Sequence, residues 1–219
     1  MSATAAATPA RRPRGRPRKL PEAQDEGNRR QELLHAAARL FREHGFAATT
    51  TRDIAAAAGM RSGSPFYHFE NKAALLFAVM EQGMRAALQR QAEALQAEPA
   101  GAAPAARLRT LVRAHFDVLL GPGSDFIPVM LYEWRSLSPA QRAGIEKLQQ
   151  AYEGAWRDAL QALAAAGRIA ADARIARLMM LGALNWSAQW YKPKKGLSLD
   201  ELTDQAMQLF VPAPQRRRA

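Results

Sequence analysis

Apolar residues recur at spacings of three and four between residues 28 and 211, and this periodicity constrains the fold of the chain more than any other feature. A helix with 3.6 residues per turn places such residues on one face, whereas a half-buried strand requires strict alternation. The sequence has no alternating run bounded by turn residues. Capping residues, glycines and prolines divide the periodic region into nine expected helices, at residues 28–45, 50–59, 63–69, 71–98, 105–120, 126–135, 138–166, 172–191 and 198–211. The expected fold class is therefore all-α, and no internal repeat is present.

The positive charge of the chain lies at its two ends. The formal net charge is +11, of which residues 1–20 contribute +6, residues 216–218 contribute +3, and the remainder only +2. Residues 1–27 contain four prolines and few large apolar residues, so they cannot build a core and are expected to form a flexible arm. Residues 212–219 form a short basic tail, for which the sequence suggests no role.

The expected compartment is the cytoplasm. The chain has no cysteine, so disulfides do not hold the fold together. Its N-terminal alanine-rich stretch precedes the arginines and is too short for a secretory signal, and no apolar run approaches the ~20 residues of a membrane-spanning helix. We therefore expect an intracellular protein that has no membrane partner.

Two short helices joined by a glycine turn have the pattern of a helix-turn-helix. Thr50 and Asp53 form a capping-box-like pair that starts the first of them, and small residues 55–58 allow the second helix to cross closely. The second helix crowds hydrogen-bonding side chains onto about two turns, as base and phosphate contacts require. These residues are Arg61, Ser62, Ser64, Tyr67 and His68. A helical hairpin with a solvated polar face is the alternative to DNA binding.

The basic arm supports the DNA-binding interpretation. In the segment RPRGRPRK, residues 12–19, glycine and proline separate Arg14, Arg16 and Arg18, so the backbone stays narrow and extended. Narrow A-tract minor grooves are strongly negative and attract arginines presented in this way. The segment also resembles an AT-hook. A solubility tail or a contact with an acidic partner is the alternative function for the arm.

Three segments together resemble the tetracycline-repressor (TetR) family of bacterial transcriptional regulators. They are LFREHGF at residues 40–46, TTTRDIAAAAGM at 49–60 and SGSPFYHFENKAALL at 62–76. The resemblance implies a helix-turn-helix domain at residues 28–72 and a helical effector-binding and dimerisation domain at residues 73–211. It also implies that the protein is a repressor in the bacterial cytoplasm, associated with the nucleoid through DNA binding and released from its operator by a small hydrophobic effector.

By position, the resemblance assigns DNA contacts to individual residues. Thr50, Arg52 and Lys72 are expected to contact phosphates, and the recognition helix is expected to carry Arg61, Ser62, Ser64, Phe66, Tyr67 and His68. Phe66 stands where the family often has tyrosine, so a phosphate hydrogen bond is lost or passes to Tyr67. Pro65 replaces a common aliphatic residue, within the first turn of the helix, where its missing N–H costs little.

The last two helices, residues 172–191 and 198–211, are each amphipathic and either complete their own core or pair with a second copy of the chain. The family resemblance favours a homodimer with a four-helix bundle, which presents two recognition helices to a palindromic operator of double-stranded DNA.

An effector cavity is expected in the C-terminal domain. Such a cavity needs apolar lining and a few convergent polar groups. The candidates are His115, Phe116, Met130, Tyr132, Glu133, Trp134, Arg135, Trp156, Met180, Asn185 and Trp186. Simple core packing is the alternative role for each. Asn185 is distinctive because an amide on an otherwise apolar helix must find a partner.

The segments at residues 131–139 and 182–202 resemble TetR-type regulators of fatty-acid, steroid or aromatic-acid breakdown, several of which respond to acyl-CoA thioesters. On that resemblance Arg135, Lys192, Lys194 and Lys195 are candidates for CoA phosphates. A drug or efflux regulator with an aromatic, non-CoA ligand is one alternative, and an architectural DNA binder without effector is another.

No cofactor, metal site or enzymatic activity is expected. The sequence contains no HExxH, GxSxG or phosphate-binding glycine loop, and its four histidines offer little catalytic material.

Overall fold

The computed structural model describes residues 22–60, 65–193 and 196–211, and side chains from residue 26 onward except those of residues 65 and 66. The expected all-α fold class is confirmed, since the described elements are helices and no strand occurs among them. The elements are α1 (Glu22–Ala48), α2 (Thr51–Ala57), α3 (Pro65–His68), α4 (Lys72–Gln96), α5 (Pro104–Leu120), α6 (Phe126–Glu133), the 3-10 helix η1 (Trp134–Ser136), α7 (Pro139–Ala165), α8 (Ala173–Trp190) and α9 (Leu199–Phe210).

Local capping determines most of these helix starts. The hydroxyls of Thr50, Ser138 and Ser198 each accept from the backbone N–H three residues on, and the Asn71 side chain caps α4 in the same way. Each cap satisfies a backbone donor that would otherwise lack a partner in the first turn. The expected starts of these four helices agree with the structure to within one residue.

Helix α1 differs from the expectation at both ends. It begins at Glu22, so residues 22–27 are helical and the arm, expected to extend to residue 27, has a helical end. The sequence at residues 22–26, EAQDE, is acidic. Acidic residues near the N-terminus of a helix stabilise it by interacting favourably with the helix dipole. At its other end, Gly45 has φ 79° and ψ 161°, a kink after which the helix runs to Ala48. Only glycine adopts such a backbone conformation readily.

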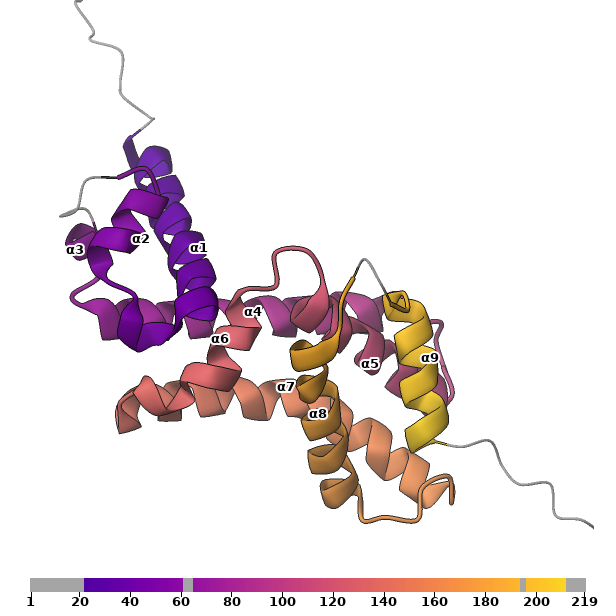
Figure 1. Ribbon diagram of the computed structural model, residues 1–219. Coiled ribbons are helices and arrows are strands. Elements are labelled where there is room, and N and C mark those ends of the chain that lie inside the picture. The colour runs from indigo at the N-terminus through magenta and orange to yellow at the C-terminus, as the bar shows by residue number, and fades with distance from the viewer. Residues whose placement is uncertain (1–21, 61–64, 194–195, 212–219) are drawn as a thin grey trace, which may run out of the picture.

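The helices form two units joined by α4 (Figure 1). In the N-terminal unit, Leu33, Leu34, Phe41 and Ile54 are buried, and α1 packs on α2 and α4. In the C-terminal unit, α5 packs against α4, α7, α8 and α9, with Trp156 fully buried in the core. Gly83 on α4 permits the close approach of α6, since a Cβ atom there would lie 2.8 Å from the Cβ of Phe126.

Candidate DNA interface and effector cavity

Helix α2 begins with the capping box expected from the sequence. The Thr50 hydroxyl accepts from the Asp53 N–H at 3.2 Å and donates to Asp53 Oδ2 at 2.7 Å, and the Thr50 N–H also donates to that carboxylate oxygen. The two hydrogen bonds from Thr50 lower the pKa of Asp53, so its carboxylate is ionised at the N-terminus of the helix. The Thr50 hydroxyl is thus used in capping, whereas Arg52 is exposed at the start of the same helix.

Helix α3 presents Tyr67, whose side chain is 86% exposed, beside the half-buried His68. Their ring centroids are 6.1 Å apart in an edge-to-face arrangement. Phe69 is buried behind them, and the Arg30 guanidinium lies 5.0 Å from its ring centroid. Exposed hydrogen-bonding rings on a short helix suit contact with DNA. Other predicted DNA contacts, Arg14, Arg16, Arg18, Arg61, Ser62, Ser64 and the Phe66 side chain, lie outside the described residues.

Lys72, predicted to contact the DNA backbone, forms two hydrogen bonds within the N-terminal unit in this structure. Its Nζ donates to the carbonyl oxygens of Phe46 at 2.7 Å and Thr49 at 2.8 Å, and lies 4.3 Å from the Phe46 ring centroid. An ammonium group has three N–H donors, so one remains for another acceptor. The side chain ties the start of α4 to the last residues of α1 and to Thr49, which follows them.

A small cavity of about 70 Å³ lies where α4, α5, α6, α7 and α8 converge. Its lining residues are Met84, Ala87, His115, Val118, Ile127, Met130, Gln149, Tyr152, Glu153, Leu181 and Asn185. Three of the predicted ligand-binding residues are among them, namely His115, Met130 and Asn185. The cavity is mostly apolar with a few polar groups, as small-molecule sites are.

His115 is the centre of a buried hydrogen-bonded group on this cavity. Its Nδ1 lies 3.0 Å from the Tyr152 hydroxyl and its Nε2 lies 3.1 Å from Asn185 Oδ1. Burial lowers the pKa of His115 to about 4 and raises that of Tyr152, so both groups are neutral near pH 7. Trp156 packs edge-to-face on the imidazole, with centroids 5.7 Å apart, but does not line the cavity.

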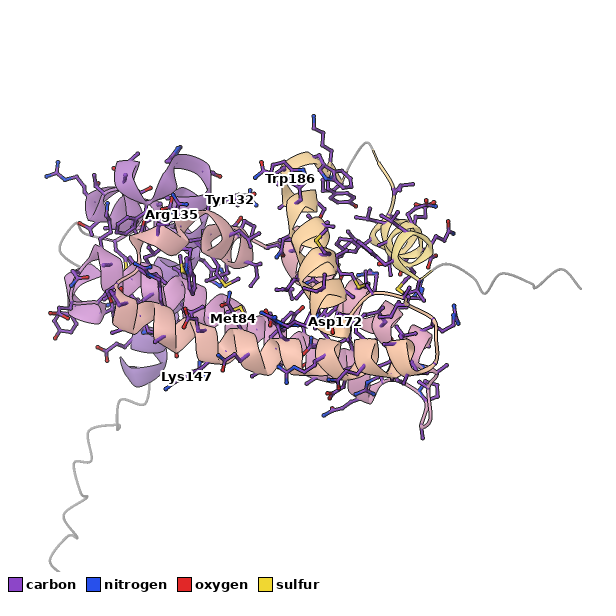
Figure 2. The ribbon with its side chains drawn as sticks, turned by 90° about the horizontal axis from the view of Figure 1, so that it is seen from below. Met84, Tyr132, Arg135, Lys147, Asp172 and Trp186 are labelled. Atoms are coloured by element: carbon purple, nitrogen blue, oxygen red, sulfur yellow. The ribbon has the colours of Figure 1, made fainter. Side chains whose placement is uncertain are left out.

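The other predicted ligand residues do not gather at this cavity. Phe116 and Met180 are buried in the core, and Trp134 is half-buried in η1. Tyr132 is exposed beside a wide groove of about 750 Å³, where its hydroxyl accepts from Gln189 at 2.7 Å. Arg135 is exposed on η1 and Trp186 on α8, so both lie away from Met84 in the interior (Figure 2).

Sequence reasoning missed Tyr152, Gln149 and Glu153, the three lining residues on α7. Tyr152 and Trp156, four residues apart within the apolar stripe of this helix, were the available signal, since such residues share a face. Lys192, a predicted CoA contact, is exposed beyond the end of α8, and Lys194 and Lys195 lie outside the described residues.

Helix α6 touches both the cavity and the N-terminal unit. Ile127 and Met130 line the cavity. At its two ends, Asp125 pairs with Arg42 of α1 at 2.8 Å, and Glu133 Oε1 accepts from the Phe46 N–H at 2.8 Å. The expectation that Glu133 serves the ligand cavity is therefore wrong, because its carboxylate is directed to the kink of α1. The same short helix contacts two functional regions.

Helix α8 carries an exposed apolar face. Its members are spaced at three, four and seven residues, and Met179 and Trp186 are about two-thirds exposed. They are Ile175, Leu178, Met179, Trp186 and Trp190, which we call the α8 face. In contrast, α9 packs on α5 and buries Leu202 and Thr203, leaving Leu209 exposed. A group of exposed large apolar side chains on one helix is typical of interaction sites.

Within the described part of the chain, no helix is long and apolar enough to cross a membrane, and no three metal-ligating side chains cluster. A capped helix-turn-helix joined through α4 to a larger helical domain is typical of a class of protein, the DNA-binding transcriptional regulators. Comparison with protein families gives the particular family. Residues 101–213 match the tetracyclin repressor-like C-terminal domain, and residues 33–79 match the bacterial regulatory proteins of the tetR family. The chain belongs to the TetR family of bacterial transcriptional regulators.

Individual relatives cover nearly the whole chain. The HTH-type transcriptional repressor KstR2 of Rhodococcus jostii (strain RHA1) is 27% identical over 197 residues, which are 87% of this chain and 95% of that protein. The structure of AibR in complex with isovaleryl coenzyme A and operator DNA is 28% identical, covers 84% of this chain and 98% of its own, and has a TM-score of 0.76. The structure of superantigen PfiT is 35% identical, covers 84% of this chain and 97% of its own, and has a TM-score of 0.69.

Proposed function

We propose that this protein is a homodimeric transcriptional repressor that binds a palindromic operator and releases it when a small effector enters the cavity. The observation that carries the proposal is the position of α6, which lines the cavity through Ile127 and Met130 and contacts α1 through Asp125 and Glu133. A ligand that shifts α6 moves the helix-turn-helix unit with it. An effector can change the affinity for DNA only if its contacts differ between the DNA-binding state and the released state.

The proposed DNA-binding domain is residues 28–72, with a net charge of +3 from seven basic and four acidic residues. Recognition of bases is assigned to α3 and the segment before it, with Arg61, Ser62, Ser64, Phe66, Tyr67 and His68. Thr50, Arg52 and Lys72 stand at helix starts that face phosphates in this mode of docking. Arg14, Arg16 and Arg18 of the arm extend the contact into the adjacent minor groove.

Dimerisation is assigned to the α8 face, together with the exposed part of α9. Two copies related by a two-fold axis would cover each other's Met179, Trp186 and Leu209, which are otherwise two-thirds or more exposed. Gly182 lies within the same face and has no neighbouring atom within 4 Å of a Cβ position, so a second helix can approach closely there. The effector-binding and dimerisation domain spans residues 73–211.

The proposed effector is an acyl-CoA thioester with a short acyl chain. Support for this class of ligand comes from the AibR structure, which holds isovaleryl coenzyme A together with operator DNA; the proposed release rests on the contacts of α6. The cavity volume of about 70 Å³ also supports a short chain, since a water-sized group needs ~10–15 Å³ and so on the order of five such groups fit. Steroid rings, the class named for the ketosteroid regulator KstR2 of Mycobacterium tuberculosis, exceed that volume.

The proposal is tested by fluorescence anisotropy with DNA from the region upstream of the gene. The full-length protein should bind one palindromic site, and a series of acyl-CoA thioesters with two to eight acyl carbons should release it, the shorter members at lower concentration. Absence of any specific site would refute the repressor proposal, whereas a bound operator that no thioester releases would refute the effector alone.

The arm is tested by the same titration across salt concentrations, with residues 1–20 removed. Loss of phosphate contacts lowers the slope of log affinity against log salt, by ~0.9 for each contact. An unchanged slope would show that the arm does not bind DNA.

A further inference from the structure

The hydrogen-bonded group formed by the buried Tyr152 and His115 and the half-buried Asn185 has a defined direction of hydrogen bonding. His115 is neutral because burial disfavours its charged form, so its imidazole has one donor nitrogen and one acceptor nitrogen. Its Nε2 faces Asn185 Oδ1, which only accepts, so Nε2 carries the proton. The Nδ1 atom is then the acceptor, and the Tyr152 hydroxyl donates to it.

The hydrogen bonds therefore run from the Tyr152 hydroxyl to His115 and from His115 to Asn185 Oδ1. The two N–H groups of Asn185 Nδ2 take no part in this series. Neither has a hydrogen-bond partner among the residues that the structure describes. Asn185 lines the cavity, so these donors are available to a molecule inside it. Asn185 is half-buried, so a ligand acceptor in the cavity would give these donors a protein-shielded partner in place of water.

The other two polar side chains of the cavity wall, those of Glu153 and Gln149, contact neighbouring protein groups. The Glu153 carboxylate forms an ion pair with Arg177, and the Gln149 amide lies 3.8 Å from the sulfur of Met130. The remaining lining residues are apolar side chains of α4, α5, α6 and α8. The cavity therefore offers a small apolar space with a donor group at Asn185.

We propose that Asn185 Nδ2 donates a hydrogen bond to the carbonyl oxygen of a short acyl group held in this cavity, and that Tyr152 and His115 are positioning residues that orient the amide. The proposal rests on the proposed function in taking this cavity as the effector site. It adds the chemical requirement that the effector carry an acceptor next to a small aliphatic group. A matched molecule without the carbonyl oxygen should bind more weakly, by the contribution of that one hydrogen bond.

The test uses two small probes, N-acetyl-S-isobutyrylcysteamine, a thioester, and N-acetyl-S-isobutylcysteamine, the thioether in which CH₂ replaces the carbonyl. Binding to the full-length protein is measured by calorimetry without DNA. The thioester should bind about 10-fold more tightly, the difference made by one buried hydrogen bond. In Asn185→Leu this preference should fall to less than about 2-fold, whereas the control Gln150→Leu, which removes an exposed amide of α7 outside the cavity, should keep it.

Selective labelling with ¹⁵N-asparagine gives a readout that needs no variant, because the chain contains three asparagines, at positions 28, 71 and 185. One pair of side-chain amide proton resonances should shift downfield with the thioester and not with the thioether. If Asn185→Leu fails to fold, Tyr152→Phe replaces it. Without the hydroxyl donor, His115 can change tautomer and the preference for the thioester should decrease several-fold.

Equal affinity of the two probes, a preference that survives Asn185→Leu, or no thioester binding at its solubility limit would each overturn the proposal. These outcomes concern direct binding to the cavity. Failure of the proposed function is seen separately, as absence of operator binding or of operator release by acyl-CoA.

Discussion

At the scale of single residues, Lys72 links stability to DNA binding. Lys72→Met removes two hydrogen bonds to the carbonyls of Phe46 and Thr49 and should lower the free energy of unfolding by about 1–3 kcal/mol. Urea unfolding without DNA measures this change. If Lys72 instead acted only through a phosphate, the variant would keep wild-type stability and lose about one contact from the salt slope of DNA binding.

His115 should make stability dependent on pH in a defined window. Its folded pKa of about 4 lies below the ordinary value of 6.5, so the unfolded state binds more protons between these values. The contribution of His115 to the free energy of unfolding is therefore fully present well above pH 6.5 and is lost as the pH is lowered towards 4. From pH 7 to pH 5 this contribution should cost about 2 kcal/mol. His115→Gln should lack that part of the slope in urea unfolding at both pH values; an unchanged slope would mean that another group is responsible.

The residues of the cavity show what a sequence cannot reveal at this scale. His115 and Asn185 were predicted separately, but their contact joins residues 70 positions apart and depends on how α5 and α8 pack. Asn185 and Trp186 are neighbours in sequence, yet one faces the interior and the other faces outward. Periodicity identifies an apolar face but not whether the same chain or another copy covers it.

At the scale of elements, helix boundaries were predictable because they are set locally. Thr50, Asn71, Ser138 and Ser198 each cap a helix through a bond to a residue three positions on, and such pairs are visible in sequence. The role of α6 was not predictable. Its approach to α4 depends on the missing side chain of Gly83, and Glu133 reaches a backbone N–H 87 positions away.

Helix α6 should transmit effector binding to the DNA-binding unit through Glu133. Glu133→Ala removes the acceptor for the Phe46 N–H and for the Ser136 hydroxyl. We expect operator affinity to change by only a few-fold, whereas the ratio of affinities with and without effector should fall by about 10-fold. Anisotropy titrations with and without the acyl-CoA measure both quantities. Glu146→Ala, an exposed glutamate on α7, is the control and should keep the full ratio.

At the scale of the whole molecule, the α8 face decides whether two DNA-binding units act together. Trp186→Glu places a charge on a side chain that is 66% exposed in the single chain, so the folded monomer should tolerate it. Burying that charge in an interface without a partner is costly, so the dimer should dissociate.

Sedimentation velocity at micromolar concentration should then show a monomer, with helix content unchanged by circular dichroism. Operator affinity should decrease by at least about 100-fold, because each half-site is bound without the gain from linkage to the other. Gln150→Glu makes the same change of charge at an exposed position of α7 and should remain dimeric. If the Trp186→Glu protein were dimeric with full operator affinity, the dimer interface would lie elsewhere. Because α8 also carries Asn185, this result would mean that α8 serves the effector cavity without taking part in subunit pairing.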